Sequence, residues 1–341
     1  MDAPRSIVIV KLSAIGDVLH GIPTAVALKR AFPTSSIGWV VEGRSADVLA
    51  GHQAIDHLFR LPRGWLKSAR QVAGLRRDLK RFHPDVTLDL QGLLKSGVAA
   101  VLSGSRLRIG HAQPEARECS WLASNRRVSA TASHVVDRNL ELLAPLGLAC
   151  PEVGFQMPRW PVSRQRVASW FEPLQQQGSP VVLNPGAGWA SKRWPPDRFA
   201  ALAQAMWRRR GIRSLIIWGG ASEEVTAREI VAAAGAAAIM APATSLQDLG
   251  ELFRMSPLVV SGDTGPLHLA AAVGARCVGL FGPVPAERNG PYGRGHVIVE
   301  PPAELRPQWE DRKTDTAAMA AISVEQVLAA VEKALSRADA A

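Results

Sequence analysis

The sequence predicts an α/β protein made of two doubly wound domains. At 341 residues the chain is longer than one hydrophobic core usually serves, so two domains of roughly 150 residues each are expected. Short apolar runs rich in Val and Ile alternate with stretches of helical periodicity, and this alternation is interrupted once along the chain. With 47% hydrophobic residues, the chain can fill two cores.

The first domain is expected at residues 1–150. It opens with the apolar run SIVIVKL at 6–12, which is typical of a buried strand, and a polar turn then leads into a helix that ends near Phe32. In residues 66–82, apolar side chains recur at helical spacing, which predicts a second helix. Further strands are expected at 37–41, 86–90 and 107–109, and a further helix at 93–102.

A proline-rich stretch follows, and the linker is expected at 151–162. The second domain, expected at 163–322, repeats the alternation. Its strands are expected at 181–184, 215–218, 238–240, 258–260 and 277–280, and its helices at 196–210, 222–234 and 245–255. A last helix at 323–337, within the terminal segment 323–341, has an apolar face that would let it pack back across the linker. Two Rossmann-like halves facing across a cleft, with a binding site between them, are the predicted architecture.

Composition narrows the partners and the compartment. Lys plus Arg number 40 and Asp plus Glu 30, a net charge of +10 that favours an anionic partner: nucleic acid, a phospholipid surface or a phosphorylated substrate. Cys119, Cys150 and Cys277 form no CxxC pair, which indicates a reducing compartment. The sequence shows no signal-peptide pattern and no apolar stretch of membrane-spanning length, so a cytosolic protein is expected.

Residues 258–281 read as strand, tight turn, helix and strand, with the polar residues confined to the turn. Asp263 or Thr264 can cap the helix, and Pro266 suits its first turn. The free N–H groups of such a helix lie at the carboxyl end of a strand, where open α/β sheets bind ligands, so this is a natural seat for a nucleotide phosphate. An ordinary capped turn explains the pattern equally well, although packing leaves His268 unexplained.

Missing motifs exclude several chemistries. The chain has no P-loop motif, no GxGxxG after the first strand, no GxSxG and no HExxH. Neither a P-loop NTPase nor a dinucleotide dehydrogenase is therefore supported, and no sequence-local metal site is visible. The class of protein that agrees best with these absences is a metal-free transfer enzyme with a nucleotide-bound donor.

Three turns could carry that chemistry. In the turn after the first strand, Asp17, with His20 nearby, could take a proton from an attacking hydroxyl, or Asp17 could merely cap the helix. The loop NPGAGWASKRWP at 184–195 suits a pyrophosphate, because its small residues allow close backbone approach and Lys192 adds a charge, or it is a solvated surface loop. Glu223, in the turn WGGASEE, could accept hydrogen bonds from a ribose or complement a helix dipole.

Residues 60–81 are strongly basic. The segment has eight Lys and Arg against the single acid Asp78, whereas a solvated helix face usually mixes signs. Five of the cations are predicted to follow one helical stripe: Arg63, Lys67, Arg70, Arg77 and Arg81. Because the chain has no zinc spacing and no RNP-like motif, a phosphorylated lipid at a membrane face fits this segment better than duplex nucleic acid.

Six ordered motifs resemble the family 9 glycosyltransferases. They are VKLSAIGDVLHGIP (10–23), DLQGLLKSG (89–97), SKRWP (191–195), WGGASEE (218–224), SGDTGPLHLAAAVG (261–274) and LFGPVPAERNGPYG (280–293). The resemblance implies a GT-B fold and an inverting transfer of heptose from ADP-heptose to a Kdo sugar of a lipid A acceptor. It implies no metal and no cofactor, since the ADP-sugar is a substrate.

The resemblance also implies roles for particular residues. The catalytic base is expected to be Asp17. The donor site is expected to include Lys192, Glu223, Asp263, Thr264, Gly265, His268, Gly188, Ser191 and Thr244. The acceptor side is expected to include Arg60, Arg63, Lys67, Arg117, His20 and Gln91. Such an enzyme would work at the anionic cytoplasmic face of the inner membrane as a peripheral protein, with no specific nucleic acid partner.

The chain departs from the family pattern at two places. Ala187 and Gly188 stand where hydroxyl residues often precede the SKRWP stretch, so phosphate contacts would come from backbone N–H groups or Ser191. Thr244 stands where a methionine often lies beside the adenine. Two alternatives therefore stay open: a related transferase with another nucleotide sugar or a protein acceptor, and a non-catalytic, nucleotide-regulated protein that docks on anionic membrane or nucleic acid.

Overall fold

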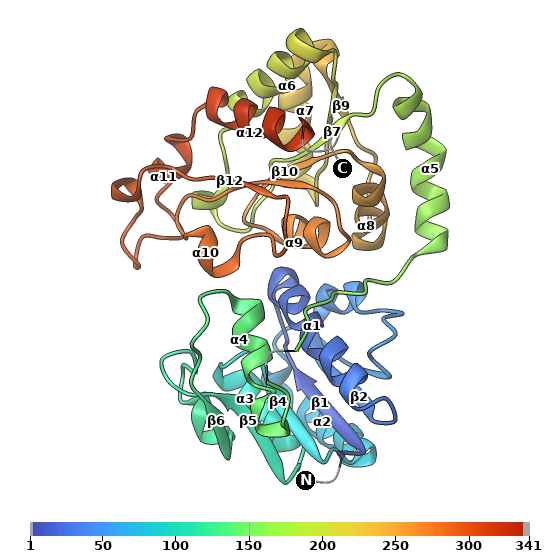
Figure 1. The fold of residues 1–341 in the computed structure, drawn as a ribbon, viewed down its shortest axis with the longest axis vertical. Helices are drawn as coiled ribbons and strands as arrows, with labels where there is room; N and C mark the ends of the chain where they lie inside the picture. Colours follow the sequence, from blue (N-terminus) through green and yellow to red (C-terminus); the bar gives the residue numbers. More distant parts are fainter. Residues whose placement is uncertain (1–2, 150, 337–341) are drawn as a thin grey trace. The chain divides into compact units, whose positions relative to one another are not determined.

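The computed structural model describes residues 3–149 and 151–336, and it divides into two compact units (Figure 1). Unit 1 comprises Met1–Pro158 and unit 2 comprises Arg159–Ala341. Each unit is built around its own six-stranded sheet, in which all neighbouring strands are parallel. Cys150 and the last residue of the expected terminal helix lie outside the described residues.

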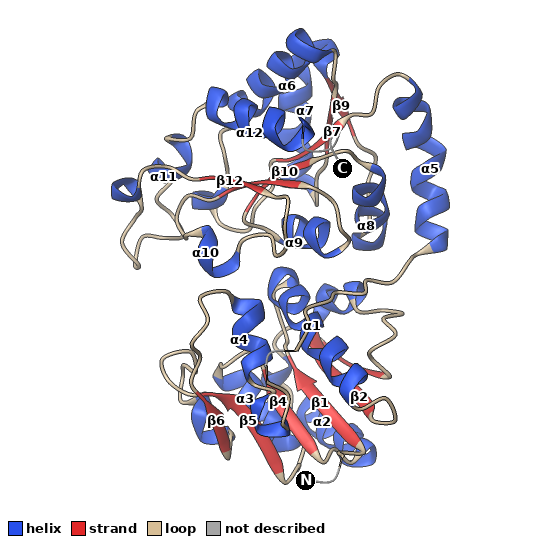
Figure 2. Cartoon of the chain, viewed as in Figure 1, coloured by secondary structure: helices blue, strands red, loops and turns tan. Residues whose placement is uncertain are grey.

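The sheet of unit 1 has the strand order β3-β2-β1-β4-β5-β6. Its strands are β1 (Ser6–Val10), β2 (Ser36–Glu42), β3 (His57–Leu61), β4 (Val86–Asp89), β5 (Leu107–His111) and β6 (Arg126–Val128). Its helices are α1 (Ile15–Ala31), α2 (Ala69–Phe82), α3 (Leu94–Leu102) and α4 (Val135–Glu141). Helices flank the sheet, with α1 packed against α4 and α2 against α3 (Figure 2). This double cover explains why four apolar residues follow Ser6 in the central strand β1 without alternation, since every residue of the strand is buried.

The sheet of unit 2 has the order β12-β11-β10-β7-β8-β9. Its strands are β7 (Val181–Asn184), β8 (Ser214–Ile216), β9 (Ala238–Met240), β10 (Val259–Gly262), β11 (Cys277–Leu280) and β12 (Val297–Val299). Its helices are α5 (Pro161–Gln176), α6 (Pro196–Arg210), α7 (Ala221–Ala234), α8 (Leu246–Met255), α9 (Gly265–Ala272), α10 (Ala286–Asn289), α11 (Ala317–Ala320) and α12 (Val324–Ser336).

The terminal helix α12 packs on α6 and β12. Its residues Val327, Leu328 and Val331 belong to the same hydrophobic core as the strands of unit 2. Just before α12, the carbonyl of Ile322 accepts a hydrogen bond from the indole N–H of the buried Trp194, at 2.9 Å. The C-terminal segment therefore helps to fix the SKRWP loop.

The predicted basic stripe of 63–81 is wrong as a single helix. α2 begins only at Ala69, because the hydroxyl of Ser68 accepts the N–H of Gln71 and caps a new helix there. Residues Trp65–Lys67 form a separate 3-10 turn, and Arg63 precedes it. Sequence patterns also missed several elements, among them the edge strands β3 and β6, whose polar residues and short length hide the strand signal.

Parallel pairing decides where the loops lie. All six strands of a sheet end at the same edge, so segments that follow β1, β2, β4 and β5 are neighbours in unit 1, and those that follow β7, β8, β9, β10 and β11 are neighbours in unit 2. These loops hold nearly all the residues singled out in the sequence. Among the described helices, none is both long and apolar enough to cross a bilayer.

Candidate active site

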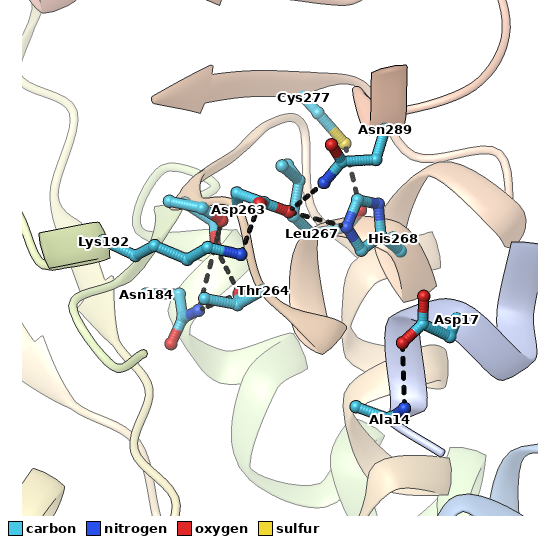
Figure 3. Close-up of polar contacts among 12 residues, drawn as sticks. Ala14, Asp17, Asn184, Lys192, Asp263, Thr264, Leu267, His268, Cys277 and Asn289 are labelled. Atoms are coloured by element: carbon cyan, nitrogen blue, oxygen red, sulfur yellow. Dashed lines mark hydrogen bonds and ion pairs between the residues drawn. The ribbon is translucent and has the colours of Figure 1, made fainter. Parts of the chain in front are cut away.

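The turn between β10 and α9 has Asp263 at its centre (Figure 3). Lys192 Nζ donates to Asp263 Oδ2 at 2.5 Å. On the other oxygen, Oδ1, Asn289 Nδ2 donates at 2.9 Å and His268 Nε2 lies at hydrogen-bond distance, 3.1 Å. The carboxylate thus binds groups from three segments of unit 2: the loop after β7, helix α9 and helix α10.

Burial and charge act in opposite directions on Asp263. The residue is 6% exposed, and burial alone would raise the pKa of its carboxyl group. Hydrogen bonding and positive charge from His268 and Lys192 nevertheless hold that pKa well below its usual range. Asp263 is therefore ionised at neutral pH, and it fixes a cationic ammonium at the edge of the sheet.

Asn184, at the end of β7, stiffens the same turn. Its Nδ2 donates to Ser261 Oγ at 2.9 Å and to Thr264 Oγ1 at 3.1 Å. Thr264 stands at the N-cap position of α9, but its side chain makes no capping bond there, unlike the sequence expectation. The first turn of α9, which begins at Gly265, is held against β7 by these side chains instead.

The loop that carries Lys192 approaches β10 closely. A Cβ atom on Gly262 would lie 2.7 Å from the Lys192 carbonyl oxygen, so only glycine fits at the end of β10. Lys192 Nζ also lies 4.5 Å from the centre of the Trp189 ring. In this loop Gly188 is exposed with open space around it, whereas Ser191 is fully buried and donates its hydroxyl to the Arg312 carbonyl at 2.7 Å.

A cavity of about 360 Å³ lies beside this loop in unit 2. Glu223 lines it, and its Oε2 accepts the N–H of Gly219 at 2.8 Å. Gly186 also lines the cavity and lies directly beside Glu223, since an added Cβ would lie 2.3–2.5 Å from the Glu223 carboxylate. Thr244 follows β9, and its buried hydroxyl oxygen has no hydrogen-bond partner among the described residues.

Asp17 lies in the first turn of α1, after β1. Its Oδ2 accepts the N–H of Ala14 at 3.0 Å, so the carboxylate does cap the helix (Figure 3). The residue is nevertheless exposed, and its second oxygen, Oδ1, accepts no hydrogen bond within the described ranges. Capping and proton acceptance are therefore compatible for this side chain.

Two of the expected acceptor cations lie beside glycines that follow strands of unit 1. Arg117 donates its N–H to the Gly92 carbonyl at 2.8 Å, next to the turn after β4. Gly92 has φ +66°, and a Cβ there would lie 2.9 Å from the Glu115 carbonyl, so glycine is required for this contact. Arg63 lies against Gly43, just after β2.

The other expected acceptor residues differ in accessibility. Arg60 and Lys67 are exposed, and Arg60 pairs loosely with Asp47 at 3.4 Å. His20 is only 4% exposed and stacks edge-on against the His134 ring, with 5.7 Å between ring centres. Gln91 is half-buried, and its side-chain amide bonds to the backbone after β1.

Sequence reasoning missed Asn184 and Asn289 as individual side chains. Both stand inside segments that were singled out, at the end of a strand and in the LFGPVPAERNGPYG motif, but nothing in the sequence shows that they reach Ser261 and Asp263. No cluster of His, Cys, Asp and Glu suited to a metal ion is present in the part of the chain that the structure describes.

Two parallel, doubly wound domains of this kind make up the GT-B fold of glycosyltransferases. Escherichia coli heptosyltransferase WaaC, solved with ADP, superposes with a TM-score of 0.78 at 26% identity, over 96% of this chain and 99% of that one. Lipopolysaccharide heptosyltransferase 1 of Pseudomonas aeruginosa is 30% identical over 90% of each chain. Lipopolysaccharide core heptosyltransferase OpsX of Haemophilus influenzae is 24% identical over 97% of each.

The family model for glycosyltransferase family 9 (heptosyltransferase) matches residues 72–318. The chain therefore belongs to glycosyltransferase family 9, and it is a glycosyltransferase of the heptosyltransferase type.

Proposed function

We propose that the protein transfers L-glycero-D-manno-heptose from ADP-heptose to Kdo of the lipopolysaccharide inner core, the heptosyltransferase I reaction. The observation that carries the proposal is the Lys192–Asp263 pair at the carboxyl edge of the unit 2 sheet, a fixed cation at the place where such sheets bind phosphates. The names of the relatives, heptosyltransferase 1 in Pseudomonas aeruginosa and WaaC with ADP in Escherichia coli, support the donor and the reaction class.

In the proposed donor site, Lys192 contacts the diphosphate and the backbone at Gly188 and Gly265 adds N–H donors. Asp263 holds Lys192, His268 holds Asp263, and both residues face the heptose. Glu223 binds the ribose from the wall of the cavity. The adenine ring of the nucleotide then lies near Thr244. Because the Ser191 hydroxyl donates to the Arg312 carbonyl, backbone N–H groups supply the phosphate contacts in the loop after β7.

The reaction would be a single displacement without metal. The acceptor hydroxyl oxygen attacks the anomeric carbon of the heptose as the bond from that carbon to the diphosphate oxygen breaks. Asp17 takes the hydroxyl proton through its free Oδ1, and the departing ADP carries the electron pair, with its charge stabilised by Lys192. The configuration at the anomeric carbon inverts.

The acceptor would be held by the cations of unit 1. Arg60, Arg63, Lys67 and Arg117 are exposed, and they suit the carboxylate of Kdo and the phosphates of lipid A. Arg70, Arg77 and Arg81 are exposed along α2 and would place the protein on the anionic cytoplasmic face of the inner membrane as a peripheral enzyme.

The second candidate function is transfer of heptose to a different acceptor sugar of the inner core. The match to OpsX covers nearly the whole of both chains at 24% identity, not far below the 30% of the heptosyltransferase 1 match. The same donor site could therefore serve a different inner-core sugar.

A transfer assay tests the proposal. The protein is incubated with ADP-heptose and either Kdo-lipid A or a heptosylated core acceptor, and products are read by mass spectrometry. Addition of one heptose to Kdo-lipid A alone supports the proposal, and addition only to the heptosylated acceptor favours the second candidate. A melting-temperature panel with ADP, UDP and GDP checks the donor, because the nucleotide bound most tightly stabilises most.

A further inference from the structure

A chain of hydrogen bonds in unit 1 joins the loop before Asp17 to the loop that carries Arg63. Its members come from three separate parts of the sequence: the loop after β1, the end of β2, and the stretch from the end of β4 into α3. Three side chains make the connections, those of Gln91, Lys95 and Glu42. Two of these, Glu42 and Lys95, have no role in the function proposed above.

Gln91 holds the backbone that leads into α1. Its Oε1 accepts the N–H groups of Leu12 at 2.6 Å and Ser13 at 3.4 Å, and its Nε2 donates to the Ser13 carbonyl at 2.6 Å. A planar side-chain amide that bonds to both the N–H and the C=O of one residue fixes the orientation of that residue's backbone. Asp17 stands four residues further on, in the first turn of α1.

Gln91 is itself anchored from beneath. Asp89 Oδ1 accepts the N–H groups of Gln91 at 2.9 Å and Gly92 at 3.1 Å, and Asp89 Oδ2 accepts the hydroxyl of Ser96 at 2.9 Å. Asp89 is only 2% exposed, and burial raises the pKa of its carboxyl group in spite of these donors. The backbone of Gln91 is therefore fixed, and its side-chain amide is free to bond to the loop after β1.

Glu42 connects the same loop to the Arg63 segment. Lys95 Nζ donates to Ser13 Oγ at 3.0 Å and to Glu42 Oε2 at 2.9 Å. The other oxygen, Glu42 Oε1, accepts the N–H of Gly64 at 3.3 Å, next to Arg63. The side chain of Glu42 is 8% exposed and that of Lys95 29%, so this ion pair is screened less than a surface pair.

We propose that Glu42, Lys95 and Gln91 are positioning residues that hold the Asp17 carboxylate and the Arg63 guanidinium in one geometry for the acceptor. None of the three would need to touch the acceptor, which changes the role expected of Gln91. The inference rests on the proposed function, because it assumes that Asp17 accepts the proton and that Arg63 contacts an acidic group of the same acceptor.

The chain offers a matched control at the opposite end of β2. Asp56 accepts the N–H of Ile37 at 2.7 Å and the ammonium of Lys29 at 2.9 Å, the same combination of backbone anchor and ion pair that Glu42 makes. It lies at the amino end of the strand, away from the loops in question. A general loss of stability would follow from either substitution, but loss of positioning would follow only from Glu42.

The first test compares Glu42→Gln, Gln91→Met and Asp56→Asn by hydrogen–deuterium exchange and steady-state kinetics. Glu42→Gln should speed exchange in residues 12–17 and 62–67, and Gln91→Met only in 12–17. Both should lower kcat by about tenfold or more, because small displacements of a catalytic group are costly, while the dissociation constant of ADP stays unchanged. Glu42→Gln should also raise the KM for the acceptor. Asp56→Asn should change neither segment nor kcat.

The second test is a double-mutant cycle of Glu42→Gln with Lys95→Met. If the two side chains act as a pair, the double variant should lose no more of kcat/KM than the worse single variant. Additive losses, or wild-type exchange at 12–17 and 62–67 in Glu42→Gln, would overturn the inference.

Asp17→Asn, measured beside these variants, separates the two claims. An inactive Asp17→Asn together with fully active Glu42→Gln and Gln91→Met would refute the positioning chain and leave the proposed base. An active Asp17→Asn would refute the base, while faster exchange in Glu42→Gln would still show that Glu42 couples the two loops.

Discussion

Replacement of Lys192 by Met should weaken ADP binding strongly. The ammonium is held by Asp263 at 2.5 Å, and its side chain is 17% exposed, so it is a fixed charge that water screens only partly. A hydrogen bond to a charged group contributes about 1.5–3 kcal/mol. At 1.4 kcal/mol for each factor of ten, the dissociation constant of ADP should rise by roughly 10- to 150-fold.

Isothermal titration calorimetry with ADP measures this change, and Lys313→Ala is its control. Lys313 Nζ lies 5.5 Å from the same Trp189 ring that Lys192 approaches to 4.5 Å, but no ion pair joins it to Asp263 in the described part of the chain. The control should bind ADP nearly as the parent does. Equal losses in the two variants would mean that only the general positive field matters, and an unchanged constant in Lys192→Met would refute the assignment of Lys192 to the diphosphate.

Three further predictions concern the cavity, the acceptor side and the pH dependence of stability. Gly186→Ala should force the Glu223 carboxylate out of its position, since the new Cβ would lie 2.3–2.5 Å from it, and should cost about 1–3 kcal/mol in urea unfolding together with a weaker ADP affinity. Charge reversal of both Arg63 and Lys67 to Glu should raise the KM for Kdo-lipid A and leave ADP affinity unchanged, because the proposed donor residues belong to unit 2. If ADP affinity, measured by titration, falls together with the rise in KM, the assignment of these residues to the acceptor is contradicted. Burial, with positive charge nearby, lowers the pKa of His111 from 6.5 to about 4 in the folded protein. As the pH drops from 6.5 to 4, the unfolded chain therefore takes up a proton that the folded protein does not, and the free energy of unfolding should fall by up to about 3 kcal/mol. Urea unfolding of His111→Gln should show a shallower fall over this pH range, and an equal fall would exclude this histidine as the cause.

Much of the fold follows from local sequence patterns. The buried strands β1, β7, β10 and β11 are short apolar runs bounded by turn residues, and helix α6 begins at a proline and ends before a glycine, so its bounds were predicted correctly. The break between Lys67 and α2 was not predicted, because periodicity in charged residues continues through a capping serine that redirects the backbone.

The candidate site was predictable as a set of loops and not as a set of contacts. Glycines and a cation after β7, and Asp263 after β10, indicated a ligand-binding edge because parallel strands end together. The bonds from Asn289 to Asp263 and from Glu42 to Gly64 join residues 26 and 22 positions apart in the chain, and only the folded backbone brings them together. Long-range polar contacts of this kind leave no periodic signal.

Single-turnover transfer by Asp17→Asn tests the mechanism most directly. Asn keeps the size of the side chain and can still cap α1, but it cannot accept the proton of the acceptor hydroxyl. At saturating ADP-heptose and Kdo-lipid A, the variant should keep the parent melting temperature and ADP affinity and lose at least about 10² in the rate of heptose transfer. A variant that transfers heptose at the parent rate would contradict the role of Asp17 as the base.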